Sequence, residues 1–145
     1  MKKLQTEFGE LEISEDAVLH FPDGIYGFED THDYVIINHD EQGIIMTLQT
    51  TEGQMPQFVV IDPYAVLATY QPKLSTSDKS KLGIQTEKEL KFLVIAVVKE
   101  NYLETVVNLK SPLAINPATN TAYQVFLEND DYSMRYPIFQ QNGGK

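Results

Sequence analysis

Short runs of β-branched and aromatic residues recur along the chain, and turn-forming residues separate most of them. This spacing indicates about ten short strands. The alternation is clearest in residues 103–109, where Leu103, Thr105, Val107 and Leu109 fall on one face of an extended strand. The predicted strands are residues 3–8 and 11–14, which form a first hairpin, and residues 17–21, 34–38, 44–49, 57–62, 92–98, 103–109, 113–116 and 123–128.

One segment has the pattern of a helix instead. Ser75 or Ser77 can cap its start, Asp78 favours its first turn, and Gly83 can end it. Parallel strands need long crossover connections, which are usually helical, and a single helix candidate cannot supply them for so many strands. We therefore expect a mainly β fold, an antiparallel sandwich or barrel, with one short helix.

Length and composition are those of one soluble domain. The 145 residues are near the common domain size, and a hydrophobic fraction of 42% is too high for a disordered chain. The chain has no cysteine, which fits a reducing compartment. The first ten residues lack the apolar stretch of a signal peptide, and the longest apolar run, residues 92–98, is far below the ~20 residues that cross a bilayer. We expect a cytoplasmic protein that does not bind membranes.

The net charge narrows the class of partner. Acidic residues outnumber basic ones by 21 to 11, which gives a formal charge of −10. Such a field repels nucleic-acid phosphates and anionic lipid, and it speeds the encounter with basic partners. The sequence therefore argues against direct nucleic-acid binding, and leaves open whether the charge serves a basic partner or only keeps the protein in solution.

Signatures of catalysis are missing from the sequence. No glycine cluster follows a strand and begins a helix, as a phosphate-binding loop requires, and neither the G-x-S-x-G nor the H-E-x-x-H motif occurs. His20, His32 and His39 lie in the first forty residues, but a site made of His32, His39 and a carboxylate matches no common ligand spacing. The acidic stretch 128–132 lacks the glycine and alternating oxygens of a calcium loop. We expect a protein that is not an enzyme, with no catalytic residue, no metal and no cofactor.

The segment HFPDGIYGFED, residues 20–30, contains apolar and aromatic residues that no regular element would bury together. Pro22 ends the preceding strand, and Pro-Asp-Gly favours a turn. Two hypotheses follow. Phe21, Ile25 and Phe28 can plug one end of a barrel, or part of the segment can stay exposed as a binding patch with an acidic rim of Asp23, Glu29 and Asp30. The two can also hold for different residues of the segment.

The same segment resembles the F-P-x-G-I-x-G-F-E signature of the flagellar assembly factor FliW family. FVVIDPY at residues 58–64 is similar to the family's F-V-V-x-D-P element, and VVNLKSPLAIN at residues 106–116 resembles its N-L-x-A-P-I-x-I-N element. QVFLENDDYSMRYPI at residues 124–138 resembles the closing stretch of the family, and the helix candidate lies where the family has a short helix. The four motifs occur in the expected order over nearly the whole chain.

This resemblance implies a compact antiparallel β-barrel-like domain, over residues 1–139, that is cytoplasmic and not an enzyme. Apart from the resemblance, the stretch QQNGGK at 140–145 is expected to be a mobile tail, and we expect a monomer when the protein is free. Such a protein would bind the RNA-binding repressor CsrA, which relieves repression of flagellin translation, and would bind flagellin itself. The predicted protein-binding residues are Ile25, Tyr26, Phe28, Glu29 and Asp30. A non-catalytic barrel that carries a small ligand is the alternative.

Overall fold

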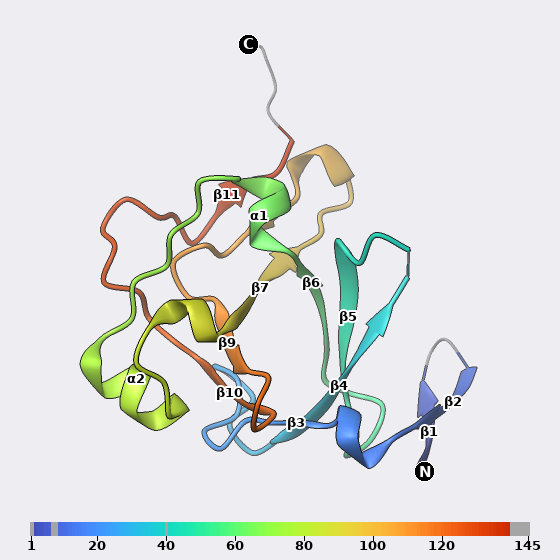
Figure 1. Ribbon diagram of the computed structural model, residues 1–145. Coiled ribbons are helices and arrows are strands. Elements are labelled where there is room, and N and C mark those ends of the chain that lie inside the picture. Colours follow the sequence, from blue (N-terminus) through green and yellow to red (C-terminus); the bar gives the residue numbers. More distant parts are fainter. Residues whose placement is uncertain (1, 7–8, 40, 140–145) are drawn as a thin grey trace.

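The computed structural model describes residues 2–6, 9–39 and 41–139 (Figure 1). Its strands are β1 (Lys2–Thr6), β2 (Gly9–Ile13), β3 (Leu19–His20), β4 (Asp33–Asn38), β5 (Ile45–Thr50), β6 (Gln57–Ile61), β7 (Lys91–Val97), β8 (Val106–Val107), β9 (Leu113–Asn116), β10 (Thr121–Gln124) and β11 (Tyr136–Pro137). Its helices are α1 (Pro63–Val66) and α2 (Thr76–Leu82), with 3-10 turns η1 (Glu15–Ala17), η2 (Glu87–Glu89) and η3 (Tyr102–Glu104). The predicted tail at 140–145 lies outside the described residues.

The main sheet closes on itself to form a barrel. Within the described ranges, hydrogen-bonded neighbours follow the order β3, β4, β5, β6, β7, β9 and β10, and β10 returns to β3. Closure depends on β7, because its first half pairs with β9 and its second half pairs with β8 on the same edge. Strands β8 and β11 then continue the sheet beyond the barrel. The expected mainly β, barrel-like fold with one main short helix is confirmed.

One contact in the barrel differs from the antiparallel expectation. The pairings are antiparallel except between β3 and β10, which run parallel through the single residue pair His20 and Thr121. Parallel neighbours need a long connection, and here most of the barrel lies between the two strands in sequence. The parallel contact therefore needs no helical crossover.

The molecule has two hydrophobic cores that share β7. The barrel interior is filled by the buried side chains Leu19, Phe21, Ile25, Tyr34, Met46, Leu48, Val60, Leu93, Leu113, Ile115 and Ala122. The second core lies outside the barrel and includes Leu74, Leu82, Val94 and Leu127. Strand β7 supplies Leu93 to the first core and Val94 to the second, which explains why residues 92–96 are apolar without alternation.

The helix prediction is confirmed, including both of its caps. The Ser75 side chain accepts a hydrogen bond from the Asp78 N–H at 3.1 Å, and Gly83 takes a left-handed conformation with φ of +71°. The second helix, α1, was missed by the sequence analysis although its start is marked, since the Asp62 side chain caps it and Pro63 occupies its first turn. None of the helices in the described ranges is long and apolar enough to span a membrane.

The strand predicted at residues 103–109 is wrong over much of its length. The Asn101 side chain caps the 3-10 turn η3, and only β8 (Val106–Val107) is a strand. Thr105, Val107 and Leu109 are nevertheless buried, whereas Leu103 is exposed. The alternation of the sequence thus indicated which face of the segment is buried, but not how many of its residues form a strand.

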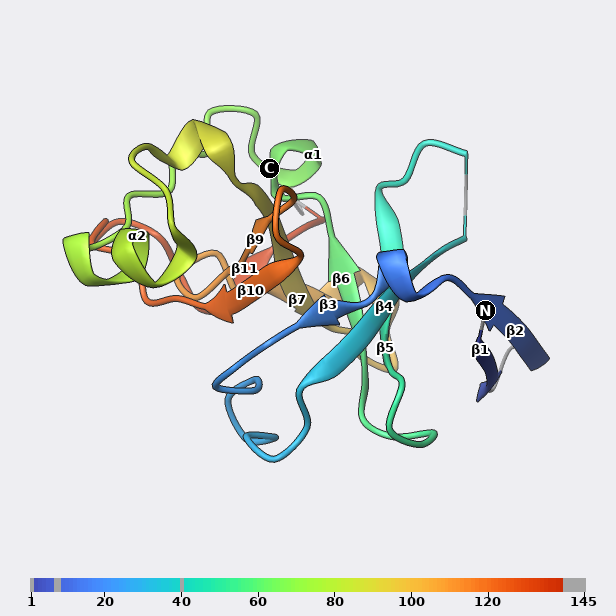
Figure 2. The same ribbon diagram turned by 60° about the horizontal axis from the view of Figure 1, so that its bottom comes forward.

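The first hairpin is confirmed and stands apart from the barrel. Strands β1 and β2 form their own two-stranded sheet, with Leu4 opposite Leu11. Figure 2 shows this hairpin projecting from the barrel at the end where β3 begins. The segment of residues 20–30 projects separately, from the other end of β3.

Candidate protein-binding site

The segment of residues 20–30 closes the barrel with part of its length. Phe21 and Ile25 are 0% and 1% exposed, and both belong to the barrel core. The Phe21 ring packs edge-on against Tyr34, with ring centroids 5.3 Å apart. The plug hypothesis is therefore confirmed for Phe21 and Ile25. Because the Ile25 side chain is enclosed, we leave it out of the candidate contact surface.

The next three residues form a tight turn that faces outward. The Ile25 carbonyl accepts a hydrogen bond from the Phe28 N–H at 2.6 Å, and Gly27 between them has φ of +91°, as the third position of a type II turn requires. Tyr26, at the second position, is 87% exposed. Phe28 is 45% exposed and packs edge-on against Phe58. The prediction that Phe28 is a buried plug residue is therefore wrong.

A second glycine brings the two arms of this turn together. Gly24 has φ of +69°, and a Cβ atom at this position would lie 2.6 Å from the Glu29 Cα atom. No side chain fits at that distance. Glu29 itself helps to hold the turn, since its carboxylate accepts the Gly27 N–H at 3.1 Å.

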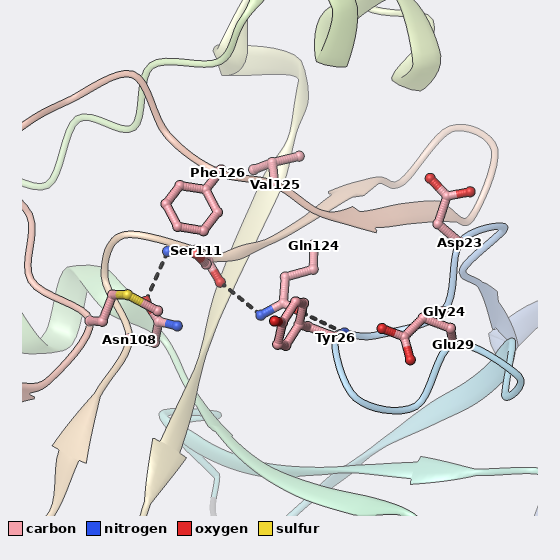
Figure 3. Close-up of a pocket in the computed structure, with 10 residues that line it drawn as sticks. Asp23, Gly24, Tyr26, Glu29, Asn108, Ser111, Gln124, Val125 and Phe126 are labelled. Atoms are coloured by element: carbon pink, nitrogen blue, oxygen red, sulfur yellow. Dashed lines mark hydrogen bonds between the residues drawn. The ribbon is translucent and has the colours of Figure 1, made fainter.

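The turn is tied to a distant part of the chain (Figure 3). The Tyr26 N–H donates to the Gln124 side-chain oxygen at 2.9 Å, and the Gln124 side-chain nitrogen donates to the Ser111 carbonyl at 3.3 Å. Backbone atoms at position 26 are thus fixed to the end of β10 and the segment before β9. Tyr26 presents its ring from a supported backbone.

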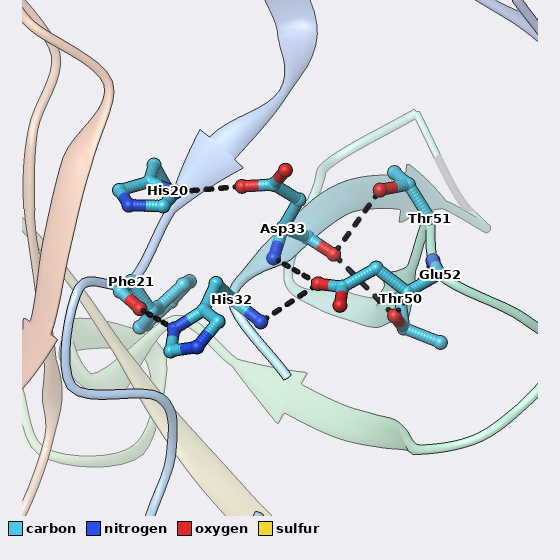
Figure 4. A network of polar contacts seen from close by, with 7 residues as sticks. All are labelled: His20, Phe21, His32, Asp33, Thr50, Thr51 and Glu52. Atoms are coloured by element: carbon cyan, nitrogen blue, oxygen red, sulfur yellow. Dashed lines mark hydrogen bonds and ion pairs between the residues drawn. The ribbon is translucent and has the colours of Figure 1, made fainter. Parts of the chain in front are cut away.

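The base of the segment is held by a polar network (Figure 4). One Glu52 carboxylate oxygen accepts the N–H groups of His32 and Asp33 at 2.7 and 2.8 Å. A His32 ring nitrogen lies 2.9 Å from the Phe21 carbonyl oxygen, and a His20 ring nitrogen lies 2.7 Å from an Asp33 carboxylate oxygen. These side chains have structural partners, and among the described residues no group of three or more His, Asp or Glu is placed to hold a metal ion.

Two hollows lie on either side of Tyr26. The first has a volume of about 460 Å³ and the second about 510 Å³, and they share Tyr26, Asn108, Gln124 and Met134 as lining residues. The charged lining residues of the first hollow are Asp23 and Glu29, and those of the second are Lys99 and Arg135. The surface therefore carries opposite charges on its two sides.

We call the apolar side chains around these hollows the Tyr26 surface. Four members line the hollows, namely Tyr26 (87% exposed), Val97 (52%), Phe126 (63%) and Met134 (52%). The fifth, Phe28 (45%), packs on Phe58, which lines the second hollow. Such a gathering of exposed apolar side chains with a polar rim is typical of a protein-binding surface. Of the predicted residues, Tyr26, Phe28, Glu29 and Asp30 are exposed, and of these four Tyr26 and Glu29 line the hollows.

Three members of this surface were missed from the sequence. Val97, Phe126 and Met134 lie at the end of β7, after β10 and before β11, and they reach Tyr26 only through the closure of the barrel. Phe126 did carry a signal, since it alternates with the buried residues Val125 and Leu127 and so had to face outward.

The Tyr34 ring, which packs against Phe21, lies in the barrel core. Burial, with a smaller contribution from the nearby Glu52 charge, raises the pKa of Tyr34 to about 12. The Tyr34 hydroxyl has no hydrogen-bond partner among the described residues. The ring that supports the plug is therefore held in a water-excluded setting.

Comparison with known proteins identifies the family. The family model described as FliW protein matches residues 2–138. A flagellar assembly factor FliW from Syntrophus aciditrophicus is 34% identical over 140 residues, covering 97% of this chain and 89% of the relative. Another from Natranaerobius thermophilus is 32% identical over 146 residues, covering 100% of this chain and 97% of the relative.

A solved structure agrees with the sequence matches. The crystal structure of the flagellar assembly factor FliW superimposes with a TM-score of 0.86 at 28% identity, and covers 95% of this chain and 97% of that one. The segment that plugs the barrel, the strand order and the motifs spread over the chain thus have one common explanation: the chain belongs to the FliW family of flagellar assembly factors.

Proposed function

We propose that this protein regulates flagellin synthesis by binding proteins rather than by catalysis. In this proposal it sequesters the RNA-binding repressor CsrA in the cytoplasm and also binds flagellin. Free flagellin would occupy the protein, CsrA would be released, and flagellin translation would fall. Competition of two partners for one limited protein needs only mass action. Family membership supports this proposal.

The observation that carries the binding role is the exposure of Tyr26. An aromatic side chain that is 87% exposed gains nothing from burial in the free protein. Tyrosine is enriched among the residues that dominate binding energy at interfaces, and a fixed backbone lowers the entropy cost of docking. The turn that holds Tyr26 is supported by Gln124 and Glu29, so this cost is already reduced before a partner arrives.

Charge supports the choice of a basic partner. A repressor that grips RNA presents positive surface, and a protein of formal charge −10 is drawn to it. Glu29 and Asp30 lie exposed beside Tyr26, where they add to this attraction. The same net charge disfavours direct binding of nucleic acid or of an anionic membrane.

The mode of inhibition can be read from titrations of RNA against CsrA at several concentrations of this protein. If acidic residues imitate RNA phosphates, the apparent RNA affinity falls without limit as the protein is added. If the protein docks beside the RNA site, the effect reaches a plateau. We favour docking, because the exposed apolar side chains of the Tyr26 surface do not resemble a phosphate chain.

The experiment that tests the function is size-exclusion chromatography of the protein with a CsrA homologue and with flagellin, separately and together. We expect a complex with each and displacement of one by the other. Tyr26→Ser should weaken at least one complex, whereas Tyr102→Ser should not, because Tyr102 is also exposed but lines neither hollow. Failure of the unchanged protein to bind either partner would refute the proposal.

A further inference from the structure

The first hollow beside Tyr26 has the composition of a receptor for a cation. Its charged lining residues, Asp23 and Glu29, are both acidic, and two exposed aromatic rings, Tyr26 and Phe126, line it as well. Carboxylates attract a cation directly, and the face of an aromatic ring adds to this attraction when the cation lies over it. In Figure 3 the two carboxylates lie on one side of Tyr26 and Phe126 lies on the other.

Cations of the protein itself already gather at the edge of this hollow. The Lys81 ammonium lies 3.7 Å from an Asp23 carboxylate oxygen, and the Lys110 ammonium lies 5.9 Å from the centre of the Phe126 ring. Neither lysine lines the hollow. Lys81 thus shows that Asp23 attracts positive charge, whereas Lys110 also donates to the Asn129 carbonyl and owes its position in part to that bond.

A buried hydroxyl gives an independent indication that a polar group belongs here. Ser111 lines the hollow and is only 5% exposed, and its side-chain oxygen has no hydrogen-bond partner among the described residues. Leaving such a group unpaired costs about 1–3 kcal/mol, so buried hydroxyls are normally paired. The backbone N–H of Ser111 is bound by Asn108 and its carbonyl by Gln124, which leaves the hydroxyl as the group with spare capacity.

We propose that the first hollow receives an arginine side chain of a partner protein. A guanidinium group is planar, so it can stack on an aromatic ring while its five N–H donors reach several acceptors at once. Asp23 and Glu29 offer such acceptors around one opening, and the buried Ser111 hydroxyl belongs to a residue of its wall. This inference rests on the proposed function only in treating the Tyr26 surface as a protein-binding surface.

The second hollow determines the orientation in which a partner segment binds. Lys99 and Arg135 line it, and none of its lining residues in the described ranges is acidic, so it favours an acidic side chain. A partner segment that crosses Tyr26 with arginine on one side and an acidic residue on the other matches both hollows. The reversed orientation places like charges together at both ends, which is unfavourable.

The probe for this proposal is arginine amide, titrated into the isotope-labelled protein and followed by NMR. We expect backbone signals from Tyr26, Gly27, Val125 and Phe126 to shift. Citrulline amide, which has nearly the same shape and the same α-amino group but an uncharged side chain, should leave them in place. Added salt should weaken the effect of arginine amide, because the attraction is partly between charges at the surface.

Matched variants locate the site. Glu29→Gln keeps an oxygen that can accept the Gly27 N–H but removes the negative charge. Asp23→Asn removes the other negative charge of the hollow. Each should weaken arginine amide binding by about twofold to fivefold, the range of a partly exposed ion pair. Asp130→Asn, at an exposed residue that lines neither hollow, should have no effect.

Two results would overturn the proposal: equal shifts with citrulline amide, or arginine shifts that do not map to the hollow and survive Glu29→Gln and Asp23→Asn together. These results are independent of the chromatography with CsrA and flagellin. The hollow can bind arginine amide while neither named partner binds, and the named partners can bind while the hollow does not.

Discussion

Ile25 and Tyr26 are neighbours in the chain, yet one is 1% exposed and the other 87%. Both belong to the same turn, whose hydrogen bond runs from the Phe28 N–H to the Ile25 carbonyl. The turn sends the first side chain into the barrel and the second into solvent. A plug and a binding surface therefore need only two consecutive residues and one glycine with positive φ.

The two residues also differ in what supports them. Ile25 is surrounded by core side chains, so its burial contributes about 1.5–3 kcal/mol to stability. Tyr26 contributes almost nothing to stability through its ring, and only its backbone N–H is engaged, by Gln124. Ile25 thus serves the stability of the fold and Tyr26 serves the proposed binding, so substitutions at the two positions can test these roles separately.

The largest effect is expected for Ile25→Asp. A carboxylate in the barrel core has no partner there, and we expect a loss of more than about 3 kcal/mol in the free energy of unfolding, enough to unfold a marginal domain. Ile25→Val, the matched control, should cost only about 1 kcal/mol. Chemical denaturation followed by circular dichroism measures both. A stable Ile25→Asp protein would show that Ile25 is not part of the core.

The next effect concerns the two glycines of the turn. Gly24→Ala forces a Cβ to within 2.6 Å of the Glu29 backbone, and we expect a loss of about 2–3 kcal/mol in stability together with a displaced Tyr26. Gly27→Ala meets no atom within 4 Å and should cost only the strain of positive φ, about 1 kcal/mol. Thermal melts distinguish the two variants. Equal losses would mean that the close contact at Gly24 is not decisive.

A smaller effect, dependent on pH, is expected at Tyr34. Its pKa in the folded protein, about 12, is above the unfolded value of 10, so its contribution to stability is complete below pH 10 and is lost as the pH rises towards 12. Tyr34→Phe should remove this loss. At neutral pH Tyr34→Phe should change the free energy of unfolding by no more than about 1 kcal/mol, because the hydroxyl has no hydrogen-bond partner among the described residues. Urea titrations at pH 7 and at pH 10 to 12 measure the free energy of unfolding of both proteins. If that free energy falls with pH as steeply in Tyr34→Phe as in the unchanged protein, the prediction is wrong.

The smallest effect on stability is expected for Tyr26→Ser, at the exposed side of the comparison. The free energy of unfolding should change by no more than about 0.5 kcal/mol, since the ring is in solvent and the Gln124 bond uses the backbone. Differential scanning calorimetry can confirm this in the sample used for binding. A marked loss of stability would mean that the ring supports the fold and that any binding defect is indirect.

Features set by local chemistry could be predicted from the sequence. The caps of α2 depend on Ser75 and Gly83, and the plug depends on Phe21 and Ile25, which are marked by the flanking Pro22 and Gly24. The FliW-like motifs pointed to the family for the same reason, because they lie in contiguous stretches. Residue type and short-range spacing were sufficient in each case.

Features set by barrel closure could not be predicted in this way. The sequence does not show that Gln124 would bind the backbone of Tyr26, or that Met134 would line the same hollow. The sequence marks Ile25 and Phe28 both as plug candidates and as predicted binding residues. The path of the turn after β3 decides between these roles, and it buries Ile25 and leaves Phe28 partly exposed.

The hydrogen bond between Tyr26 and Gln124 also bears on when the binding surface comes into existence. During synthesis residue 26 leaves the ribosome before the side chain of Gln124, which holds it and follows 98 residues later. Met134, which lines both hollows, follows later still. A growing chain therefore exposes Tyr26 without the surface around it. A partner that needs the whole surface can engage the chain only after Gln124 and Met134 have been added and the barrel has closed.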